Sequence, residues 1–442
     1  MSIFKAYDIR GLFPQELNEE LAYWIGRAFV DFLGCRSVVV GRDMRGSSSP
    51  LFASLAQGII EQGADVIDIG LCSTPMAYYA NGKLGTDAGI MITASHNPGE
   101  YNGFKLCRKG AVPISGATGI KEIEQLVNKR QLQSASTPGR VIAKPEIGDE
   151  YVRFIKSFIE QPTSYKLVFD CANAVGVYEM RVFDGAATVV PLYAELDGTF
   201  PNHEANPLKT ETLAALKEKV VAEKADLGIA FDGDADRAGF VDETGQVIPM
   251  DLITALIAKD VLTKGPQTIL YDLRSSRIVR ETILAGGGRA VECRVGHAFI
   301  KQMMRDHDAF FAGELSGHYY FKDNYTTESS ALAVVYLLNL MQKTGRKISE
   351  LVKPLQKYYQ SGEINSPVEN MKKVLETLAA RYSSGEVSDL DGLKISFPDW
   401  WFNVRGSNTE PLLRLNLEAN SKDLMLAKRD ELLQIIRGEI AA

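Results

Sequence analysis

The segment DGDADR, residues 232–237, brings three carboxylates together at alternate positions, Asp232, Asp234 and Asp236. Two like charges about 4 Å apart repel by roughly 4 kcal/mol at an effective dielectric constant of 20. Such a cluster is therefore costly unless a cation binds it or water surrounds it. Carboxylate oxygens favour Mg²⁺, Ca²⁺ or Mn²⁺ over zinc. The segment thus predicts a divalent metal site.

Two other structures fit the same carboxylates, a calcium-binding EF-hand and a solvated acidic turn. An EF-hand loop needs glycine at its sixth position, where this sequence has Arg237. The flanks, residues 225–231 and 238–249, are typical of strands and a hairpin and not of helices. The acidic turn remains open, although the segment follows a strand whose composition indicates burial.

The segment TASHNPGEYNGFK, residues 93–105, places a hydroxyl beside an imidazole, at Ser95 and His96, and ends at Lys105. Asn-Pro is a common turn dipeptide, so Ser95 can simply cap a turn, and no G-x-S-x-G motif of a hydrolase surrounds it. Beside a divalent cation, however, the serine is a candidate phosphate carrier, because phosphoserine adds about −1.5 to −2 charges. His96 can donate to a phosphoryl oxygen or fill a core, and Lys105 can also be a solvated surface residue.

The segment RGSNTEP has the composition of an anion-binding turn. Arg405 offers a planar fork that suits phosphate, and Ser407, Asn408 and Thr409 add neutral hydrogen-bonding groups. An ordinary hairpin turn fits the same composition.

The segment GELSGH alternates a carboxylate, a hydroxyl and an imidazole at Glu314, Ser316 and His318. Alternation puts the three side chains on one face of an extended segment, a pattern that suits the hydroxyl groups of a sugar. A further histidine, His297, is equally compatible with a general base and with a structural residue.

These segments follow strands of a threefold repeat. Each repeat has one strand that ends in aspartate, a second after glycine, and a third that leads into a polar segment. The first strands are expected at 37–43, 166–170 and 268–272, the second at 63–70, 185–192 and 287–294, and the third at 86–92, 225–231 and 307–313. Apolar strands that alternate with helices indicate parallel sheets covered on both faces, although chance similarity between such strands is the alternative. Because ligands bind outside the carboxyl ends of strands, three units could contribute to one site.

The last part of the chain has a different pattern. Residues 366–382 predict an amphipathic helix, residues 392–397 and 412–419 alternate as strands, and residues 421–440 predict a closing helix capped by Ser421. We therefore expect an α/β fold of three tandem related domains with mixed, mostly parallel sheets, followed by a smaller α+β domain. The expected domains are 1–147, 148–249, 250–360 and 361–442.

The composition of the 442-residue chain excludes several functions. A net charge of −7 argues against bulk attraction to nucleic acid or to an anionic membrane. The five cysteines are scattered without C-x-x-C spacing, which indicates reduced thiols and not a disulfide framework or a zinc site. No apolar run approaches the length of a membrane span, the first residues lack the apolar region of a signal peptide, and no nucleotide-binding glycine motif occurs. We expect a cytoplasmic protein that binds neither nucleic acid nor membrane.

Five segments in this order, from FKAYDIRG at residues 4–11 through TASHNP, DGDADR and GELSGH to RGSNTEP, resemble those of the α-D-phosphohexomutase family. The pattern is most similar to the bacterial phosphomannomutase/phosphoglucomutase type and spans essentially the whole chain. The resemblance implies four domains around a central cleft, with a mobile fourth domain as lid. It implies reversible phosphoryl transfer between hexose 1-phosphate and hexose 6-phosphate through a phosphoserine and a bisphosphate intermediate. It also implies Mg²⁺ as cofactor, hexose 1,6-bisphosphate as activator and sugar phosphates as partners.

The resemblance also implies roles for individual residues. Ser95 would carry the phosphoryl group and would hold the metal together with Asp232, Asp234 and Asp236. The residues expected near the transferring group are Lys105 and His297 as acid–base candidates, with His96 and Arg237 beside them. Glu314 and Ser316 would bind O3 and O4 of the sugar, with His318 nearby. Arg405, Ser407, Asn408 and Thr409 would hold the non-reacting phosphate. Tyr7, Arg10 and Arg274 match further active-site positions, although lysine is common in place of Arg274.

Two features bear on the substrate. Leu315 is apolar, as in glucose- and mannose-type mutases, whereas glucosamine-type enzymes tend to be polar at this position. The lead-in at residues 93–95 also resembles the mannose type. The alternatives are a phosphoglucosamine mutase, a metal phosphatase that acts through a phosphoserine, and a non-catalytic metal- or sugar-phosphate-binding protein. Both a monomer and a homodimer remain open.

Overall fold

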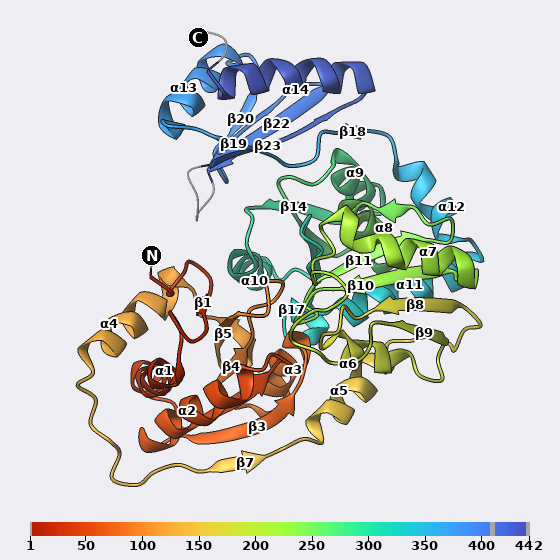
Figure 1. Ribbon diagram of the computed structural model, residues 1–442. Coiled ribbons are helices and arrows are strands. Elements are labelled where there is room, and N and C mark those ends of the chain that lie inside the picture. Colours follow the sequence, from red (N-terminus) through yellow and green to blue (C-terminus); the bar gives the residue numbers. More distant parts are fainter. Residues whose placement is uncertain (1, 407–411, 439–442) are drawn as a thin grey trace.

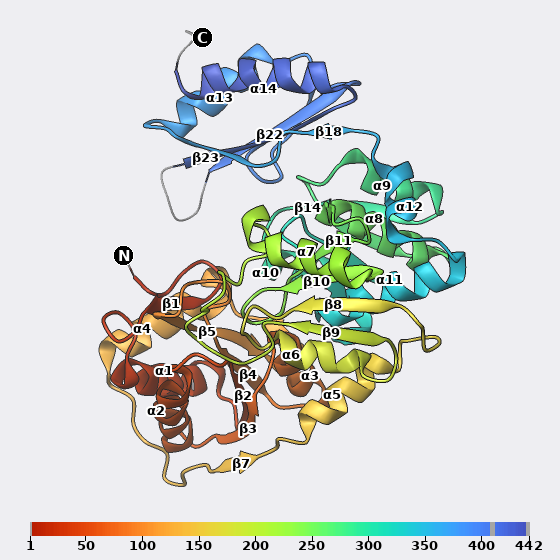
Figure 2. The same ribbon diagram turned by 45° about the vertical axis from the view of Figure 1, so that its right-hand side comes forward.

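The computed structural model describes residues 2–406 and 412–438, which form four sheets with flanking helices (Figure 1). Ser407, Asn408 and Thr409 lie outside the described residues. The three α/β sheets succeed one another along the chain, and a separate antiparallel sheet follows at the C-terminal end (Figure 2). The expected fold class is therefore confirmed, whereas the individual domain limits stay predictions.

The first sheet runs in the order β1-β5-β4-β2-β3-β7, with β6 paired to β5. Its strands are β1 (Ile9–Leu12), β2 (Ser37–Arg42), β3 (Asp65–Leu71), β4 (Ala88–Ile92), β5 (Tyr101–Arg108), β6 (Val112–Pro113) and β7 (Val141–Ala143). The accompanying helices are α1 (Glu19–Leu33), α2 (Ser48–Glu61), α3 (Thr74–Leu84) and α4 (Lys121–Lys129). In β2, Val38 and Val40 pack with α1 and α2, while Val39 packs with α3 on the other face. This division explains why a near-continuous apolar strand is stable here.

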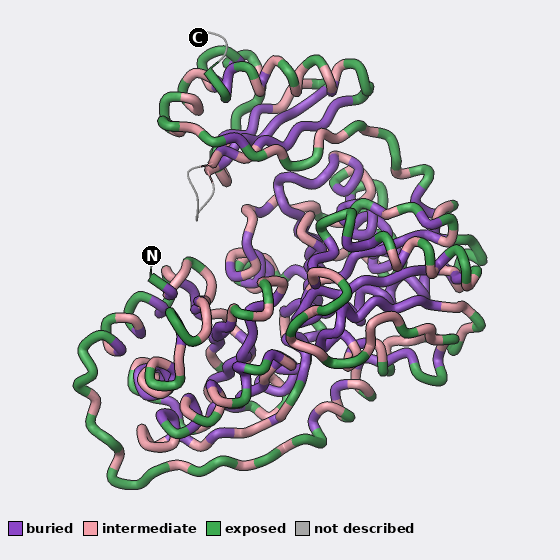
Figure 3. The backbone as a smooth tube through the Cα atoms, in the orientation of Figure 1, coloured by how far each residue is buried: buried purple, intermediate pink, exposed green. Residues whose placement is uncertain are grey.

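The second sheet runs in the order β12-β11-β10-β8-β9. Its strands are β8 (Lys166–Asp170), β9 (Thr188–Leu192), β10 (Leu227–Phe231), β11 (Ala238–Asp242) and β12 (Val247–Ile248). The accompanying helices are α5 (Ile147–Lys156), α6 (Gly176–Met180) and α7 (Ala214–Glu223). Residues 130–146, which lead to α5, are mostly exposed and run along the outside of the molecule (Figure 3).

The third sheet runs in the order β14-β13-β15-β16-β17. Its strands are β13 (Thr268–Asp272), β14 (Arg289–Cys293), β15 (Phe311–Gly313), β16 (Tyr319–Phe321) and β17 (Thr327–Glu328). The accompanying helices are α8 (Met250–Leu262), α9 (Arg277–Ala285), α10 (His297–Asp306), α11 (Ser330–Thr344) and α12 (Ile348–Val352). One large apolar core joins the helices of this domain with those of the second.

The threefold repeat is confirmed by the pairing of the strands. In each α/β sheet, the first strand of the repeat (β2, β8 or β13) lies between the second and the third and is parallel to both. The following strand (β5, β11 or β16) then turns back antiparallel to the third. The polar segments after β4, β10 and β15 are therefore equivalent positions of three related sheets.

The fourth sheet is antiparallel, in the order β18-β23-β22-β21-β20, with β19 paired to β23. Its strands are β18 (Tyr359–Gln360), β19 (Ile364–Pro367), β20 (Glu386–Ser388), β21 (Leu393–Ser396), β22 (Trp400–Gly406) and β23 (Leu412–Ala419), with helices α13 (Met371–Arg381) and α14 (Lys422–Ile436). Ser421 caps α14 as expected, because its hydroxyl accepts from the backbone N–H of Leu424. The expected helix over 366–382 is wrong at its start: Ile364–Pro367 is a strand, and α13 begins after the capping side chain of Asn370.

All five cysteines are buried and free, in agreement with the expected reduced thiols. Within the part of the chain that the structure describes, no helix has the length and apolar character needed to cross a bilayer.

Candidate active site

The loops that follow β4, β10 and β15 meet one another. Arg237 and His318 form an isolated antiparallel bridge, and the N–H of Ala238 donates to the carbonyl of Gly317 at 3.0 Å. Gly233 lies so close to the loop after β4 that a Cβ atom on it would stand 2.2 Å from the carbonyl oxygen of Ser95. Three strand ends from three domains thus form one polar site, as ligand sites of α/β sheets do.

The three aspartates of the second loop are buried together. Asp232 and Asp234 are 0% exposed and Asp236 is 2% exposed. Each offers a carboxylate oxygen within 4.8 Å of the others. Burial, together with the negative charges of Asp236 and Asp234, raises the pKa of Asp232 to about 8. The solvated-turn interpretation is therefore wrong, and the flanking strands β10 and β11 exclude an EF-hand.

The donor set fits a hard divalent cation. Asp234 Oδ1 is buried and accepts no hydrogen bond from any described residue, and the buried Asp236 Oδ1 atom faces His318 Nε2 at 3.3 Å. Ser95 Oγ lies 2.8 Å from Asp232 Oδ2, so that a fourth oxygen adjoins the cluster. An all-oxygen donor set suits Mg²⁺ better than zinc. Within the described part of the chain, no other group of three metal-ligating side chains lies this close together.

Lys105 lies against the aspartates and is not a solvated surface residue. Its Nζ atom donates to Asp234 Oδ2 and to Asp236 Oδ2, both at 2.5 Å, and the residue is 8% exposed. Burial lowers its pKa, but the attraction of Asp234 and Asp236 outweighs burial, and the net shift raises the pKa. Lys105 is therefore a firmly charged hydrogen-bond donor within the cluster.

A buried arginine, which the sequence analysis did not identify, holds the serine loop in place. Ser95 has a left-handed backbone conformation with φ of 50°. The guanidinium group of Arg45 pairs with Asp43, and both side chains are fully buried. It also donates to four backbone carbonyls of the loop, those of Ser95, Asn97, Pro98 and Tyr101, at 2.5 to 3.1 Å. Asp43 and Arg45 follow the carboxyl end of the first strand of the repeat. The expectation that functional residues lie at the carboxyl ends of strands, which located the other loops, therefore also applies to these two residues.

His96 contacts the Ser95 hydroxyl, and Arg10 and Arg237 contact its loop and its aspartate partner. His96 Nδ1 lies 3.2 Å from Ser95 Oγ, and the positive charge of Arg237, together with burial, holds the pKa of His96 well below its usual value. Arg10 donates to the Asn97 side chain at 2.7 Å and so reaches the same loop. Arg237 Nε lies 3.6 Å from Asp232 Oδ2. A neutral imidazole thus lies beside the serine, and two guanidinium groups lie against neighbouring residues of the site.

Glu314, Ser316 and His318 lie together in the third loop. His318 Nδ1 is 2.8 Å from Ser316 Oγ and 3.2 Å from Glu314 Oε2. Its Nε2 atom lies 3.3 Å from Asp236 Oδ1. Burial opposes the charge on His318, but hydrogen bonding and attraction from Asp236 and Glu314 outweigh it and raise its pKa to about 9. The third loop is therefore coupled electrostatically to the aspartate cluster.

A chain of charges leads from this loop to the fourth domain. Arg274 Nη2 lies 2.8 Å from Asp272 and 3.6 Å from Glu314, and Nη1 lies 3.4 Å from Glu363. Glu363 also accepts from Arg405 Nη2 at 3.0 Å. A cavity of about 510 Å³ adjoins this chain and is lined in part by Arg274, Leu315, Ser316, Glu363, Trp401 and Asn416. Two of the expected phosphate- and sugar-binding arginines thus share one carboxylate.

Tyr7 and His297 lie on another side of the site. Their ring centroids are 5.7 Å apart. His297 is the first residue of α10, and burial, followed by the positive charge of Lys301, holds its pKa well below the usual value. His297 is therefore a neutral imidazole at neutral pH.

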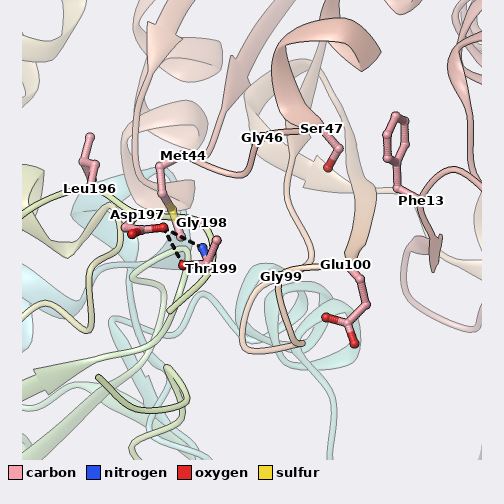
Figure 4. Close-up of a pocket in the computed structure, with 10 residues that line it drawn as sticks. All are labelled: Phe13, Met44, Gly46, Ser47, Gly99, Glu100, Leu196, Asp197, Gly198 and Thr199. Atoms are coloured by element: carbon pink, nitrogen blue, oxygen red, sulfur yellow. Dashed lines mark hydrogen bonds between the residues drawn. The ribbon is translucent and has the colours of Figure 1, made fainter. Parts of the chain in front are cut away.

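A second cavity, of about 590 Å³, lies between the first two domains (Figure 4). Its lining includes Phe13, Met44, Ser47, Glu100, Leu196 and Thr199, and none of the residues expected in the site. Among the described lining residues, no buried side-chain polar atom lacks a hydrogen-bond partner. The buried polar side-chain atoms of this lining are thus satisfied within the protein.

Family models cover nearly the whole chain. Models described as phosphoglucomutase/phosphomannomutase alpha/beta/alpha domains I, II and III match residues 1–134, 149–245 and 249–359. The model of the C-terminal domain matches residues 363–435.

Curated proteins similar to this chain include one named phosphomannomutase from Methanocaldococcus jannaschii, which is 40% identical over 99% of this chain and 98% of its own length. Another is named phosphomannomutase/phosphoglucomutase and comes from Pseudomonas aeruginosa. It is 38% identical over 96% of this chain and 92% of its own length.

Solved structures similar to this chain include a phosphoglucomutase/phosphomannomutase family protein from Burkholderia thailandensis. It has a TM-score of 0.91 and 33% identity, covering 98% of this chain and 96% of that chain. A more distant one is an N-acetylphosphoglucosamine mutase from Aspergillus fumigatus, solved in complex with GlcNAc-6P and magnesium. Its TM-score is 0.64 at 14% identity, with 98% of this chain and 96% of that chain covered, which is a likeness of fold alone.

Proposed function

The chain belongs to the phosphoglucomutase/phosphomannomutase family, and on that premise we propose that it interconverts hexose 1-phosphates and hexose 6-phosphates with Ser95 as phosphoryl carrier. One observation carries the proposal: the Ser95 hydroxyl of the first domain lies 2.8 Å from Asp232, within a buried aspartate cluster of the second. A hydroxyl that merely capped a turn would need neither this cluster nor the charged Lys105 beside it.

The reaction begins with phosphorylated Ser95. The phosphoryl group passes to O6 of a hexose 1-phosphate, or to O1 of a hexose 6-phosphate. The P–O bond to Ser95 breaks, a P–O bond to the sugar forms, and the sugar hydroxyl loses its proton to a base. The resulting bisphosphate turns in the site and returns its other phosphate to Ser95. A hexose 1,6-bisphosphate would therefore activate an enzyme whose serine has lost its phosphate.

A divalent cation, best Mg²⁺, would be held by Asp232, Asp234 and Asp236 together with the phosphate on Ser95. When bound, it would neutralise charge on the phosphoryl oxygens, which is the main requirement of phosphoryl transfer. The unpartnered Oδ1 atom of Asp234 supports this assignment. The magnesium named for the Aspergillus fumigatus mutase agrees with it.

Lys105 and His297 are the proposed acid–base residues. The raised pKa of Lys105 keeps it protonated, which suits a counter-charge to the phosphoryl group. The lowered pKa of His297 leaves it neutral, which suits a proton acceptor. His96 and Arg237 are proposed to donate to the phosphoryl oxygens, since both lie close to the Ser95–Asp232 pair.

The remaining residues are proposed to hold the substrate. Glu314 and Ser316 would bind sugar hydroxyls, with His318 between them. The non-reacting phosphate would be held by Arg405 with Ser407, Asn408 and Thr409. Tyr7, Arg10 and Arg274 would complete the walls of the site. Closure of the fourth domain over the bound sugar would keep water from intercepting the phosphoryl group.

Mannose and glucose phosphates are the proposed substrates. The relatives named phosphomannomutase and phosphomannomutase/phosphoglucomutase support this choice. Leu315 supports it as well, because its apolar side chain lines the cavity beside Ser316 and offers no partner to an amino group. A cytoplasmic location and the choice between monomer and homodimer stay predictions.

The proposal is tested by ³¹P NMR of the protein with Mg²⁺ and a trace of glucose 1,6-bisphosphate. Mannose 1-phosphate, glucose 1-phosphate and glucosamine 1-phosphate are supplied in separate samples. Conversion of the first two to 6-phosphates, without steady release of inorganic phosphate, is the expected result. Conversion of glucosamine 1-phosphate alone would overturn the substrate assignment. Steady phosphate release would identify a phosphatase instead, and binding without turnover would identify a non-catalytic protein.

A further inference from the structure

Helix α10 presents two polar side chains to one buried carboxylate. His297 and Lys301 are four residues apart and therefore lie on the same face of the helix. Both face Glu328, the last residue of β17. Lys301 Nζ donates to Glu328 Oε2 at 2.8 Å, and His297 Nδ1 lies 3.6 Å from Glu328 Oε1. The buried carboxylate thus lies within reach of both side chains.

Glu328 has little freedom to find other partners. It is 0% exposed, as is Lys301, whose ammonium group also lies 4.1 Å from the ring centre of Tyr78 in the first domain. The Oε2 atom is occupied by Lys301, whereas the buried Oε1 atom accepts no hydrogen bond from any described residue. A buried acceptor without a donor costs roughly 1–3 kcal/mol, so Oε1 favours any donor that comes within reach.

The ring of His297 is that donor. A neutral imidazole carries its proton on one nitrogen and leaves the other as acceptor. A nitrogen that faces a carboxylate oxygen must be the protonated one, because two acceptors repel. The separation of 3.6 Å is longer than a hydrogen bond, and catalytic hydrogen bonds often shorten only when substrate is bound.

We propose that Glu328 is a positioning residue that holds His297 as the Nδ1–H tautomer, so that Nε2 is left as the proton acceptor. Lys301 fixes the carboxylate from its far side and fixes which oxygen faces the histidine. The part that concerns catalysis rests on the proposed mutase function, but the tautomer does not depend on it. Glu328 would thus act on the reaction only through His297, without touching the substrate.

The test is the tautomer of His297, measured by long-range ¹H–¹⁵N NMR of the ¹⁵N-labelled protein. The chain has only five histidines, and loss of one signal set in His297→Gln assigns the residue. The expected result is an Nδ1–H ring. An Nε2–H ring in the wild-type protein would overturn the proposal without any further variant.

The variant Glu328→Gln tests whether residue 328 determines the tautomer of His297. Lys301 will retain the amide oxygen as its acceptor, so that the amide NH₂ group faces His297 Nδ1 and donates to it. The ring is then expected to switch to the Nε2–H tautomer. Glu328→Asp, which keeps the carboxylate, should keep the Nδ1–H tautomer. A ring that does not change in Glu328→Gln would contradict the proposal.

A matched control is available in the same domain. Asp260 is also 0% exposed and also pairs with a lysine, Lys343, at 2.9 Å, but no described histidine contacts it. Asp260→Asn should destabilise the domain without changing the His297 signals. If it changes them as Glu328→Gln does, Glu328 has only a structural role.

Kinetics separate this inference from the mutase proposal. Glu328→Gln should lower kcat by about 10²-fold with little change in KM, because a misplaced base loses most of its contribution. Asp260→Asn should leave both constants near their wild-type values. Absence of mutase activity in the wild-type protein would refute the proposed function and leave the tautomer result intact. An active enzyme whose His297 is an Nε2–H ring would refute the positioning role alone.

Discussion

At the residue scale, the two carboxylate oxygens of Asp234 have different surroundings. Its Oδ2 atom accepts from Lys105 at 2.5 Å and from Thr74 at 2.6 Å, while Oδ1 accepts no hydrogen bond from a described residue. One oxygen is thus used by the protein, and the other is free of donors from the described residues, as the proposed cation site requires. The two oxygens of Glu328 also differ: Oε2 accepts from Lys301, whereas Oε1 faces His297.

Asp234→Asn should weaken metal binding and slow turnover together. The amide keeps an oxygen for the hydroxyl or the ammonium group but removes the negative charge that attracts the cation. We expect the Mg²⁺ concentration at half-maximal activity to rise at least about tenfold, and kcat to fall. The measurement is mutase activity as a function of Mg²⁺ concentration. Asp242→Asn is the control, since Asp242 is the last residue of β11 and binds Thr244 and Gln246 instead. An unchanged metal profile in Asp234→Asn would exclude the ligand role.

At the scale of elements, the loop that carries Ser95 owes its shape to the end of the neighbouring strand β2. Four of its carbonyls point at one buried guanidinium group, that of Arg45. A planar fork with five donors can serve several acceptors at fixed angles, whereas an ammonium group cannot. Positioning of the serine therefore depends on a residue about 50 positions away in the sequence.

Arg45→Lys should disturb this loop while the charge is kept. Several carbonyls lose their donor, so we expect kcat to fall at least about tenfold, as well as a lower melting temperature. The control is Arg27→Lys, because Arg27 is a similarly buried arginine that binds Gln62 and the Leu132 carbonyl away from the site. That variant should lose stability and keep its kcat. Equal kcat losses in the two variants would argue against a specific role of Arg45.

The contact between the first two domains contains a carboxyl group that responds to pH. Glu179 of α6 is fully buried and accepts from Ser73 at the start of α3 and from Tyr151 of α5. Burial outweighs these hydrogen bonds and raises its pKa from 4.5 to about 7. The folded protein therefore retains a proton that the unfolded chain loses between these two values.

Stability should consequently fall as pH rises from about 4.5 to about 7. The group contributes its full stabilisation below pH 4.5 and loses about 3 kcal/mol of it by pH 7 to 8. Glu179→Gln cannot ionise, so the difference in unfolding free energy between variant and wild type should shift in favour of the variant across this range. Urea unfolding at several pH values measures it. The control is Glu122→Gln, an exposed change on α4, whose unfolding free energy should follow that of the wild type at each pH. If the curves of unfolding free energy against pH for Glu179→Gln and the wild type are parallel, the account is contradicted.

Elements and loops were predictable from the sequence to different degrees. The three repeats and the loops at their ends could be found because apolar strands and charged segments leave strong local patterns. The start of α13 could not, because residues 364–367 have a pattern compatible with a helix and only pairing with β23 makes them a strand. Arg45 and Glu328 were missed for another reason: their partners are distant in sequence, and a single buried charge has no periodicity. The roles assigned to Ser407, Asn408 and Thr409 stay predictions.

At the scale of the whole molecule, several polar contacts join the fourth domain to the third. Arg277 of α9 donates to the carbonyls of Phe397, Pro398 and Trp400. Lys394 reaches the Leu273 carbonyl and the Glu292 carboxylate. Polar interfaces of this kind permit relative motion of domains, as a lid requires. Glu363, held by both Arg274 and Arg405, is placed between the two domains.

A bound sugar phosphate should draw the fourth domain toward the others. Its phosphate would replace Glu363 as the partner of Arg405, and closure would follow. Small-angle X-ray scattering should show a smaller radius of gyration with substrate than without it. Arg405→Ala should bind substrate more weakly and show no contraction at a concentration that closes the wild type. A radius that is the same with and without saturating substrate would contradict a moving lid.

The central claim is that Ser95 carries the phosphoryl group, and peptide mass spectrometry tests it most directly. The protein is incubated with hexose 1,6-bisphosphate and then with excess hexose 1-phosphate. The account predicts one added phosphoryl group on Ser95 in the first step and its loss to the sugar in the second. Ser95→Ala should take up none, whereas Ser115→Ala, a buried serine of the same domain that binds Thr118, should behave as the wild type. Full mutase activity with no phosphate on Ser95, or with phosphate on another residue, would contradict the account.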